Sequence, residues 1–262
     1  MKNIAVITGA SSGMGREFVN KLDGKFDEIW GIGLGAEALD ALKEQTKTPF
    51  RPLELDLTNS ESIKKYQELL QQEKPNVQWL VNCAGFGKFG RYDEINVDDS
   101  ANMIDLNCKA LMEMTERTLP FMSAGSHIVQ IGSVAGFQPV PYIAVYAATK
   151  AFVISYSRAL NQELKSRKIK ITCVCPFWTK TAFFNRATDT KSKEPVVTKY
   201  VAMYKPEKVV GKAIRDTIKG KELSILGFIA RSQVRLVNML PKKMVMSTWI
   251  KQQKLHKKYK DR

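Results

Sequence analysis

Short apolar runs rich in Val and Ile alternate along the chain with longer segments whose apolar positions recur at helical spacing. This alternation is typical of a parallel sheet covered by its connecting helices. We predict strands at Asn3–Thr8, Glu28–Ile32, Arg51–Glu54, Trp79–Asn82, His127–Ile131, Lys170–Cys175 and Leu223–Leu226. We predict helices near residues 13–23, 36–46, 60–72, 98–122, 146–167 and 206–219. The predicted fold class is α/β, a doubly wound parallel sheet with helices on both faces.

Residue types at helix ends and a mixed segment refine this outline. Asp99 or Ser100 is expected to cap the fourth helix, because short polar side chains accept hydrogen bonds from the first helical N–H groups. Pro206 fits the first turn of the last helix. Residues 177–205 lie between a strand and a helix and follow neither pattern. We interpret them as a loop or lid over a site.

The formal net charge of +15 is concentrated at the end of the chain, where residues 242–262 hold eight Lys or Arg against Asp261 alone. Such a segment can attract anionic membranes or nucleic acid. We interpret it as a solvated end, and we expect no nucleic-acid partner because no recognition motif accompanies the charge. We also expect no metal site, because the four cysteines form no C-x-x-C pair and there are only two histidines.

No apolar stretch reaches the length of about 18 residues that a transmembrane helix needs. The first residues slightly resemble a signal peptide, with one Lys followed by an apolar run. Cleavage there would destroy the glycine-rich segment that follows, so we expect a cytoplasmic location.

That glycine-rich segment joins the first predicted strand to the first predicted helix. The buried strand Ile4–Ile7 runs into Thr8-Gly9-Ala10-Ser11-Ser12-Gly13-Met14-Gly15 and then into a helical pattern. Glycines at such a turn permit close approach of a pyrophosphate, whose charge is favoured at a helix N-terminus. The spacing G-x-x-x-G-x-G in this context indicates a dinucleotide-binding turn.

A second group combines Tyr146 and Lys150 with Ser133. Residues four apart on a helix share a face, so the Tyr146 hydroxyl and the Lys150 ammonium can address one site. A phenol with a pKa of about 10 needs a nearby cation to serve in acid–base catalysis at neutral pH. Ser133 follows the predicted strand His127–Ile131, at the edge where open α/β sheets bind ligands. This group predicts proton transfer to or from a substrate oxygen.

Over about residues 1–230 the chain resembles the short-chain dehydrogenase/reductase family. The resemblance is carried, in order and spacing, by Thr8–Gly15, Asn82-Cys83-Ala84-Gly85, Asn107, Ser133, Tyr146 and Lys150. It implies a single Rossmann-type domain, for which we assign residues 1–233, and NAD(P) as the cofactor. It also implies an oxidoreductase that interconverts a ketone and a secondary alcohol, and a homodimer or homotetramer paired through the helices at 98–122 and 146–167.

The resemblance also implies individual roles. Tyr146 would be the general acid/base, and Lys150 would lower its pKa and hold the nicotinamide ribose. Ser133 would orient the substrate oxygen, and Asn107 would support a water-linked proton relay. Asp56 would meet the adenine, and Thr181 would contact the cofactor near the nicotinamide amide. The implied cofactor-binding set is Gly9, Ser11, Ser12, Gly13, Met14, Gly15, Leu34, Asp56, Leu57, Asn82, Ala84, Gly85, Tyr146, Lys150, Pro176, Thr179 and Thr181.

Three positions depart from the family pattern. Cys83 stands where Asn is commoner, and Phe177 follows Pro176 where Gly is usual. The end of the second strand reads Gly33-Leu34-Gly35, without the acid that would bind a ribose 2′-hydroxyl or the Arg that would bind a 2′-phosphate. Arg16 could add positive charge nearby. We therefore lean slightly towards NADP(H) over NAD(H).

Residues expected to flank the site are strongly apolar: Val134, Phe137, Val140, Pro141, Tyr142, Phe177, Trp178, Phe183, Phe184 and Met203. No arginine cluster accompanies Ser133 or Tyr146 to clamp a small anion. We therefore expect a bulky hydrophobic substrate of the hydroxysteroid, bile-acid or acyl-chain type. A ketoacyl reductase of lipid metabolism and a catalytically silent NAD(P)-sensing regulator are the alternatives, although the catalytic set argues against the regulator.

The remaining residues, 234–262, form a basic amphipathic extension whose apolar positions are Leu236, Val237, Leu240, Met244, Val245, Trp249 and Ile250. It could cover the substrate pocket, rest on a membrane surface, or pack on its own domain or a neighbouring subunit. We favour packing over membrane contact. We expect Leu236, Leu240 and Trp249 to be buried over the substrate entrance, with fraying only from about His256.

Overall fold

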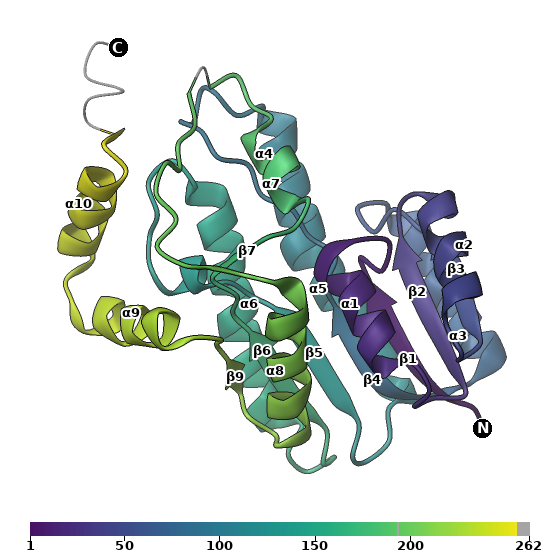
Figure 1. Ribbon diagram of the computed structural model, residues 1–262. Coiled ribbons are helices and arrows are strands. Elements are labelled where there is room, and N and C mark those ends of the chain that lie inside the picture. Colours follow the sequence, from purple (N-terminus) through teal and green to yellow (C-terminus); the bar gives the residue numbers. More distant parts are fainter. Residues whose placement is uncertain (193, 256–262) are drawn as a thin grey trace.

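A seven-stranded parallel sheet forms the centre of the molecule in a computed structural model that describes residues 1–192 and 194–255 (Figure 1). The strand order is β3-β2-β1-β4-β5-β6-β9, so the chain winds outward from β1 in both directions. The strands are β1 (Asn3–Thr8), β2 (Glu28–Gly33), β3 (Phe50–Glu54), β4 (Asn76–Asn82), β5 (His127–Ile131), β6 (Lys170–Val174) and β9 (Leu223–Ser224). The predicted doubly wound α/β class is confirmed.

Helices cover both faces of this sheet, and alternate residues of each strand point to opposite cores. Ala5 and Ile7 of β1 face one core, whereas Ile4 and Val6 face the other. The first core is closed by α1 (Gly13–Leu22), α2 (Ala36–Gln45) and α8 (Pro206–Ile218). The second is closed by α3 (Ser60–Glu73), α5 (Leu111–Thr118) and the C-terminal part of α6 (Ala144–Glu163). All strands consequently end at one common edge.

The helical segment predicted at 98–122 is continuous but irregular. It comprises α4 (Val97–Ile104), a wide π-type turn at Asp105–Ala110, α5 and a 3₁₀ turn at Leu119–Phe121. Its cap was predicted wrongly: Asn96, rather than Asp99 or Ser100, accepts the Asp98 N–H at 3.1 Å. Asp99 instead lies inside the first turn and engages a lysine described below. Pro206 begins α8, as expected.

The segment predicted as an unstructured loop, 177–205, contains three short elements. They are β7 (Trp178–Thr179), α7 (Phe183–Thr188) and β8 (Met203–Tyr204). Trp178 pairs with Met203 and Thr179 with Tyr204, so the two ends of the segment form a small parallel sheet of their own. The lid is therefore tied at its base, although no strand was predicted within it.

Two helices, α9 (Phe228–Met239) and α10 (Lys242–Gln252), lie beside the lid (Figure 1), and the extension assigned to residues 234–262 begins inside α9. Val237, Val245 and Leu255 are buried, and Trp249 is half-buried. The expectation for Leu236 was wrong, because its side chain is 55% exposed, while Leu240 is only half-buried. The fraying expected from His256 lies outside the described residues. None of the helices within 1–192 and 194–255 is long and apolar enough to cross a bilayer.

Candidate active site

The turn between β1 and α1 has space only for glycine at two positions. A Cβ on Gly15 would lie 2.0 Å from the Gly9 carbonyl oxygen, and a Cβ on Gly9 would lie 2.9 Å from the Ala84 nitrogen. Gly9 and Gly13 also have positive φ angles of 68° and 53°. Ser12 is the N-cap of α1 but its side chain makes no capping hydrogen bond. The turn is thus a bare backbone cradle at a helix N-terminus, which fits the pyrophosphate of a dinucleotide.

The ends of β1 and β4 are tied together beside this cradle. The Thr8 hydroxyl oxygen accepts hydrogen bonds from the Cys83 and Ala84 N–H groups, both at 3.0 Å. The side chain of Asn82, a predicted cofactor residue, does not bond to the glycine turn. Its amide donates at 2.9 Å to Thr115 and at 3.0 Å to Gln130 in the buried core. Its side chain therefore supports the β4 end, leaving only its backbone for the cradle.

The residues predicted at the adenine side follow β2 and β3. Leu34 is 58% exposed. Asp56 accepts hydrogen bonds from the Thr58 N–H and hydroxyl at 2.9 and 2.7 Å, and Leu57 is buried. The sequence analysis missed Glu54, whose Oε1 accepts the N–H groups of Gly35 and Ala36, both at 3.1 Å. The Glu54 carboxylate therefore lies at the N-terminus of α2. It comes from the end of β3, whereas the end of β2 lacks the acid that would bind a ribose 2′-hydroxyl.

Tyr146, Lys150 and Ser133 meet at the C-terminal edge of the sheet. Lys150 lies one helical turn after Tyr146 on α6, and its Nζ is 5.7 Å from the centre of the Tyr146 ring. The buried ammonium donates to the Ile131 carbonyl oxygen at 2.8 Å. Ser133 lies two residues after the end of β5, and its hydroxyl accepts the Ala135 N–H at 3.1 Å and is near enough to Tyr146 to act on the pKa of that phenol. The predicted catalytic side chains are therefore brought together.

Burial sets the protonation of this group. It raises the pKa of Tyr146 to about 12, against the lowering effect of the hydrogen bond with Ser133. It lowers the pKa of Lys150. The Tyr146 phenol is consequently protonated at neutral pH and able to donate a proton. The predicted lowering of the Tyr146 pKa by Lys150 stays a prediction.

Asn107 lies in the π-type turn and is fully buried. Its amide accepts the Phe86 N–H at 3.1 Å and donates to the Phe86 carbonyl at 2.8 Å and to Thr149 at 3.1 Å. These bonds join the loop after β4 to the residue preceding Lys150. A Cβ on Gly85 would lie 2.7 Å from the Asn107 Oδ1, so the close approach requires glycine there.

A largely apolar cavity opens beside the Tyr146–Ser133 pair. Six of the predicted flanking residues line it: Val134, Val140, Phe177, Trp178, Phe183 and Phe184. Among the described residues its lining does not include Phe137, Pro141, Tyr142 or Met203, so these four expectations were wrong. The Met203 side chain is 45% exposed. The cavity continues past Met14, Gly85, Pro176, Thr179 and Thr181, so substrate and cofactor residues share one space.

The α9–α10 region supplies cavity residues that the sequence analysis missed. Gln233 of α9 and Trp249, Gln252 and Gln253 of the α10 region line the cavity. The Trp249 Nε1 donates to the Pro141 carbonyl at 3.0 Å. The buried Gln253 Oε1 accepts the N–H groups of Thr198 and Lys199 at 2.9 and 3.1 Å. The extension therefore forms one wall of the cavity and holds the second half of the lid.

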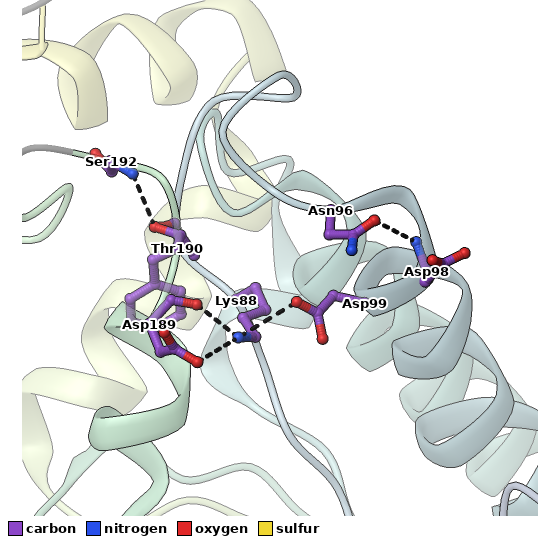
Figure 2. Close-up of polar contacts among 8 residues, drawn as sticks. Lys88, Asn96, Asp98, Asp99, Asp189, Thr190 and Ser192 are labelled. Carbon is purple, nitrogen blue, oxygen red and sulfur yellow. Dashed lines mark hydrogen bonds and ion pairs between the residues drawn. The ribbon is translucent and has the colours of Figure 1, made fainter.

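A buried lysine fastens the first half of the lid (Figure 2). The Lys88 Nζ donates to the Asp189 carbonyl at 2.6 Å and lies 3.3 Å from both the Asp189 and Asp99 carboxylates. The adjacent Phe89 N–H donates to the Ala187 carbonyl at 2.8 Å. These contacts hold the end of α7 against the loop after β4. Phe183, at the start of α7, thereby lies with its ring centre 5.5 Å from that of Tyr146.

Replacing Lys88 with Met should loosen this fastening. We expect KM for an apolar ketone to rise about fivefold to tenfold, a cost comparable to one ordinary hydrogen bond, while kcat changes less than about threefold. Steady-state kinetics of Lys88→Met, compared with Lys64→Met on the exposed side of α3, tests this. An unchanged KM, or an equal rise in the control, would show that Lys88 does not position the lid.

Comparisons with known proteins agree with this geometry. The family described as short chain dehydrogenase matches residues 3–192. An uncharacterized oxidoreductase of Staphylococcus epidermidis is 30% identical over 177 residues, covering 67% of this chain and 77% of the relative. A short-chain dehydrogenase from Sphingobium yanoikuyae in complex with NADPH is 25% identical, with a TM-score of 0.75, covering 92% of this chain and 97% of that one.

A closed serine dehydrogenase complexed with NADP+ is 26% identical, with a TM-score of 0.72, covering 85% of this chain and 94% of that one. The chain belongs to the short-chain dehydrogenase family. It is an oxidoreductase.

Proposed function

We propose that the enzyme interconverts a ketone and a secondary alcohol on a bulky hydrophobic substrate, with Tyr146 as the general acid/base. The observation that carries this proposal is the largely apolar cavity that is also lined by Tyr146, Ser133 and Lys150. When bound, the cofactor donates or accepts the hydride. Tyr146 donates a proton to the substrate oxygen during reduction and takes one during oxidation.

The other members of the set serve that proton transfer. Ser133 hydrogen-bonds the same substrate oxygen, because its hydroxyl lies beside that of Tyr146. Lys150 favours the tyrosinate electrostatically and holds the cofactor ribose. Asn107 keeps Lys150 in place through the segment before it and supports the proton relay. The glycine cradle holds the pyrophosphate, Asp56 and Leu57 border the adenine, and Thr179 and Thr181 meet the nicotinamide end.

The aromatic walls favour a substrate of the hydroxysteroid, bile-acid or acyl-chain type. The rings of Phe89, Phe183 and Trp178 surround the Tyr146 end of the cavity, so a flat or extended apolar body can pack there. A ketoacyl reductase is the second candidate, supported by Lys199 at the cavity wall, which could meet an anionic carrier. Assays of steroid ketones, ketoacyl esters and a small ketone with each cofactor decide between them. Activity with the small ketone alone would contradict both.

We propose that both cofactors bind, with a slight preference for NADP(H). Arg16, whose Nη2 donates to the Ala38 carbonyl at 3.4 Å, adds positive charge beside α2. The two solved relatives described above carry NADPH and NADP+. Glu54 acts in the opposite direction, because its carboxylate holds the Gly35 and Ala36 N–H groups that a 2′-phosphate could otherwise approach.

Glu54→Gln should therefore shift the ratio of NADP(H) to NAD(H) efficiency upward by about threefold to tenfold, because it removes a carboxylate that repels a phosphate. Gly33→Asp should shift it towards NAD(H). A Cβ at Gly33 would lie 3.2 Å from the Ser11 hydroxyl, so this side chain must shift slightly to accept the substitution. The measurement is kcat/KM with each cofactor. Glu68→Gln on exposed α3 is the control, and an unmoved ratio in Glu54→Gln would exclude Glu54 as a determinant.

We also propose a homodimer or homotetramer paired through the α4–α5 segment and α6, which pack side by side. Ile104 is 52% exposed there, and Phe152, 40% exposed, stacks on Tyr156. Sedimentation at micromolar concentration should give a multiple of 29.6 kDa. Phe152→Glu should lower that mass, since it places a charge in an apolar contact. A 29.6 kDa species for the unaltered enzyme would contradict the proposal.

A further inference from the structure

Helix α9 carries two apolar stripes on opposite sides. Ala230, Val234 and Val237 are buried at spacings of four and three, and the first two pack with Val134 and Phe177 of the domain. Phe228, Leu236 and Met239 follow one another at spacings of eight and three, which places them on a second face. That face is open: Phe228 is 75% exposed, Leu236 55% and Met239 82%.

The charged side chains of α9 and α10, the two helices that border the open stripe, are all basic. Between Phe228 and Leu255 the chain has six Lys or Arg and no Asp or Glu. Arg231 and Arg235 are exposed on α9, and Lys243 and Lys251 are exposed on α10. Met244, at the start of α10, adds a further apolar side chain that is 52% exposed. Exposed apolar groups with a positive border are the combination by which surface helices bind anionic membranes.

We propose that the outer face of the α9–α10 helix pair docks on an anionic lipid surface. Phe228, Leu236 and Met239 enter the boundary between headgroups and acyl chains, and the surrounding Arg and Lys side chains lie against lipid phosphates. The pair is a peripheral contact, since none of the described helices can cross a bilayer. This reverses the earlier preference for packing alone, because the structure gives α9 a packed face and, separately, an open one.

The position of the cavity adds a functional consequence. The same two-helix region contributes Gln233, Trp249 and Gln252 to the cavity wall. A molecule dissolved in the lipid would thus meet the protein where the cavity is formed. The docking proposal itself does not depend on the substrate class, because it rests on the exposed stripe and the charge around it.

Flotation of the full-length enzyme with vesicles tests the proposal. Vesicles containing phosphatidylglycerol and phosphatidylcholine should bind the protein, and vesicles of phosphatidylcholine alone should bind it at least tenfold less. Leu236→Glu and Met239→Glu should each lower binding to the anionic vesicles by about tenfold or more. Ile218→Glu, at an apolar side chain 58% exposed at the end of α8, carries the same charge change and should keep binding.

Three results would overturn the proposal. Equal binding by Leu236→Glu and Ile218→Glu would mean that the contact is purely ionic or lies elsewhere. Absence of binding by the unaltered enzyme to anionic vesicles would exclude docking. A lower sedimentation mass for Leu236→Glu without lipid would mean that a second copy of the chain covers this face.

A folding control accompanies these measurements. Unchanged NAD(P)H oxidation by Leu236→Glu with a small soluble ketone shows that the variant is folded.

Discussion

Replacing Tyr146 with Phe is expected to lower kcat by about 10²-fold or more, the usual contribution of a general acid/base. Phe keeps the ring that lies 5.5 Å from Phe183 and 6.4 Å from Phe89, so the aromatic packing survives. Only the hydroxyl that exchanges the proton is lost. Cofactor affinity should therefore change little, because the glycine cradle and the end of β4 are untouched.

The pH dependence gives this prediction a second signature. Because burial raises the pKa of Tyr146 to about 12, the proton-donating form persists through neutral pH. Ketone reduction should then vary little with pH, while alcohol oxidation should increase as pH rises, since it needs the tyrosinate. The increase of alcohol oxidation with pH should disappear from the residual rate of Tyr146→Phe.

The measurements are single-turnover rates in both directions and cofactor titration by fluorescence. Tyr156→Phe is the control: it lies on the same helix and loses only an exposed hydrogen bond to Glu116 at 3.3 Å. A near-normal rate for Tyr146→Phe would show that another group supplies the proton.

Replacing Lys150 with Met is expected to lower kcat by about 10²-fold or more and, unlike Tyr146→Phe, to weaken cofactor binding as well. Lys150 is 4% exposed and lies beside the phenol, so its positive charge acts in a poorly screened environment. Met fills a similar volume without the charge. Both the electrostatic support of the tyrosinate and the hydrogen bond to the cofactor ribose should therefore be lost.

The folding stability of Lys150→Met shows whether the loss of turnover and cofactor binding comes from the missing charge or from unfolding. The variant loses one hydrogen bond, from Lys150 to the Ile131 carbonyl, but no longer buries a charge, so we expect the free energy of unfolding to change by no more than about 2 kcal/mol. Denaturant unfolding and cofactor titration make the test, with Lys165→Met at an exposed site as the control. Retained turnover in Lys150→Met would remove Lys150 from the proposed mechanism.

The sequence by itself determined the parts of this protein whose information is local. The strand β1, the glycine turn and the start of α1 are contiguous. Their residue types predict this conformation and also indicate its use as a dinucleotide-binding turn. The Tyr146–Lys150 pair is likewise set by one turn of helix. The wide turn containing Asn107 left no trace in the periodicity, because one extra residue in a turn does not disturb an apolar pattern that is already irregular.

The tertiary structure alone decided the contacts whose partners are distant in sequence. Glu54 reaches the N–H groups at the start of α2 from 19 residues away, and Lys88 reaches Asp189 from 101 residues away. It also decided which apolar stripe of α9 faces the domain. Val237 is buried and its neighbour Leu236 is exposed, although both are good core residues. Periodicity identifies faces of a helix, but only the shape of the opposing surface, here formed by Val134 and Phe177, selects the face that is buried.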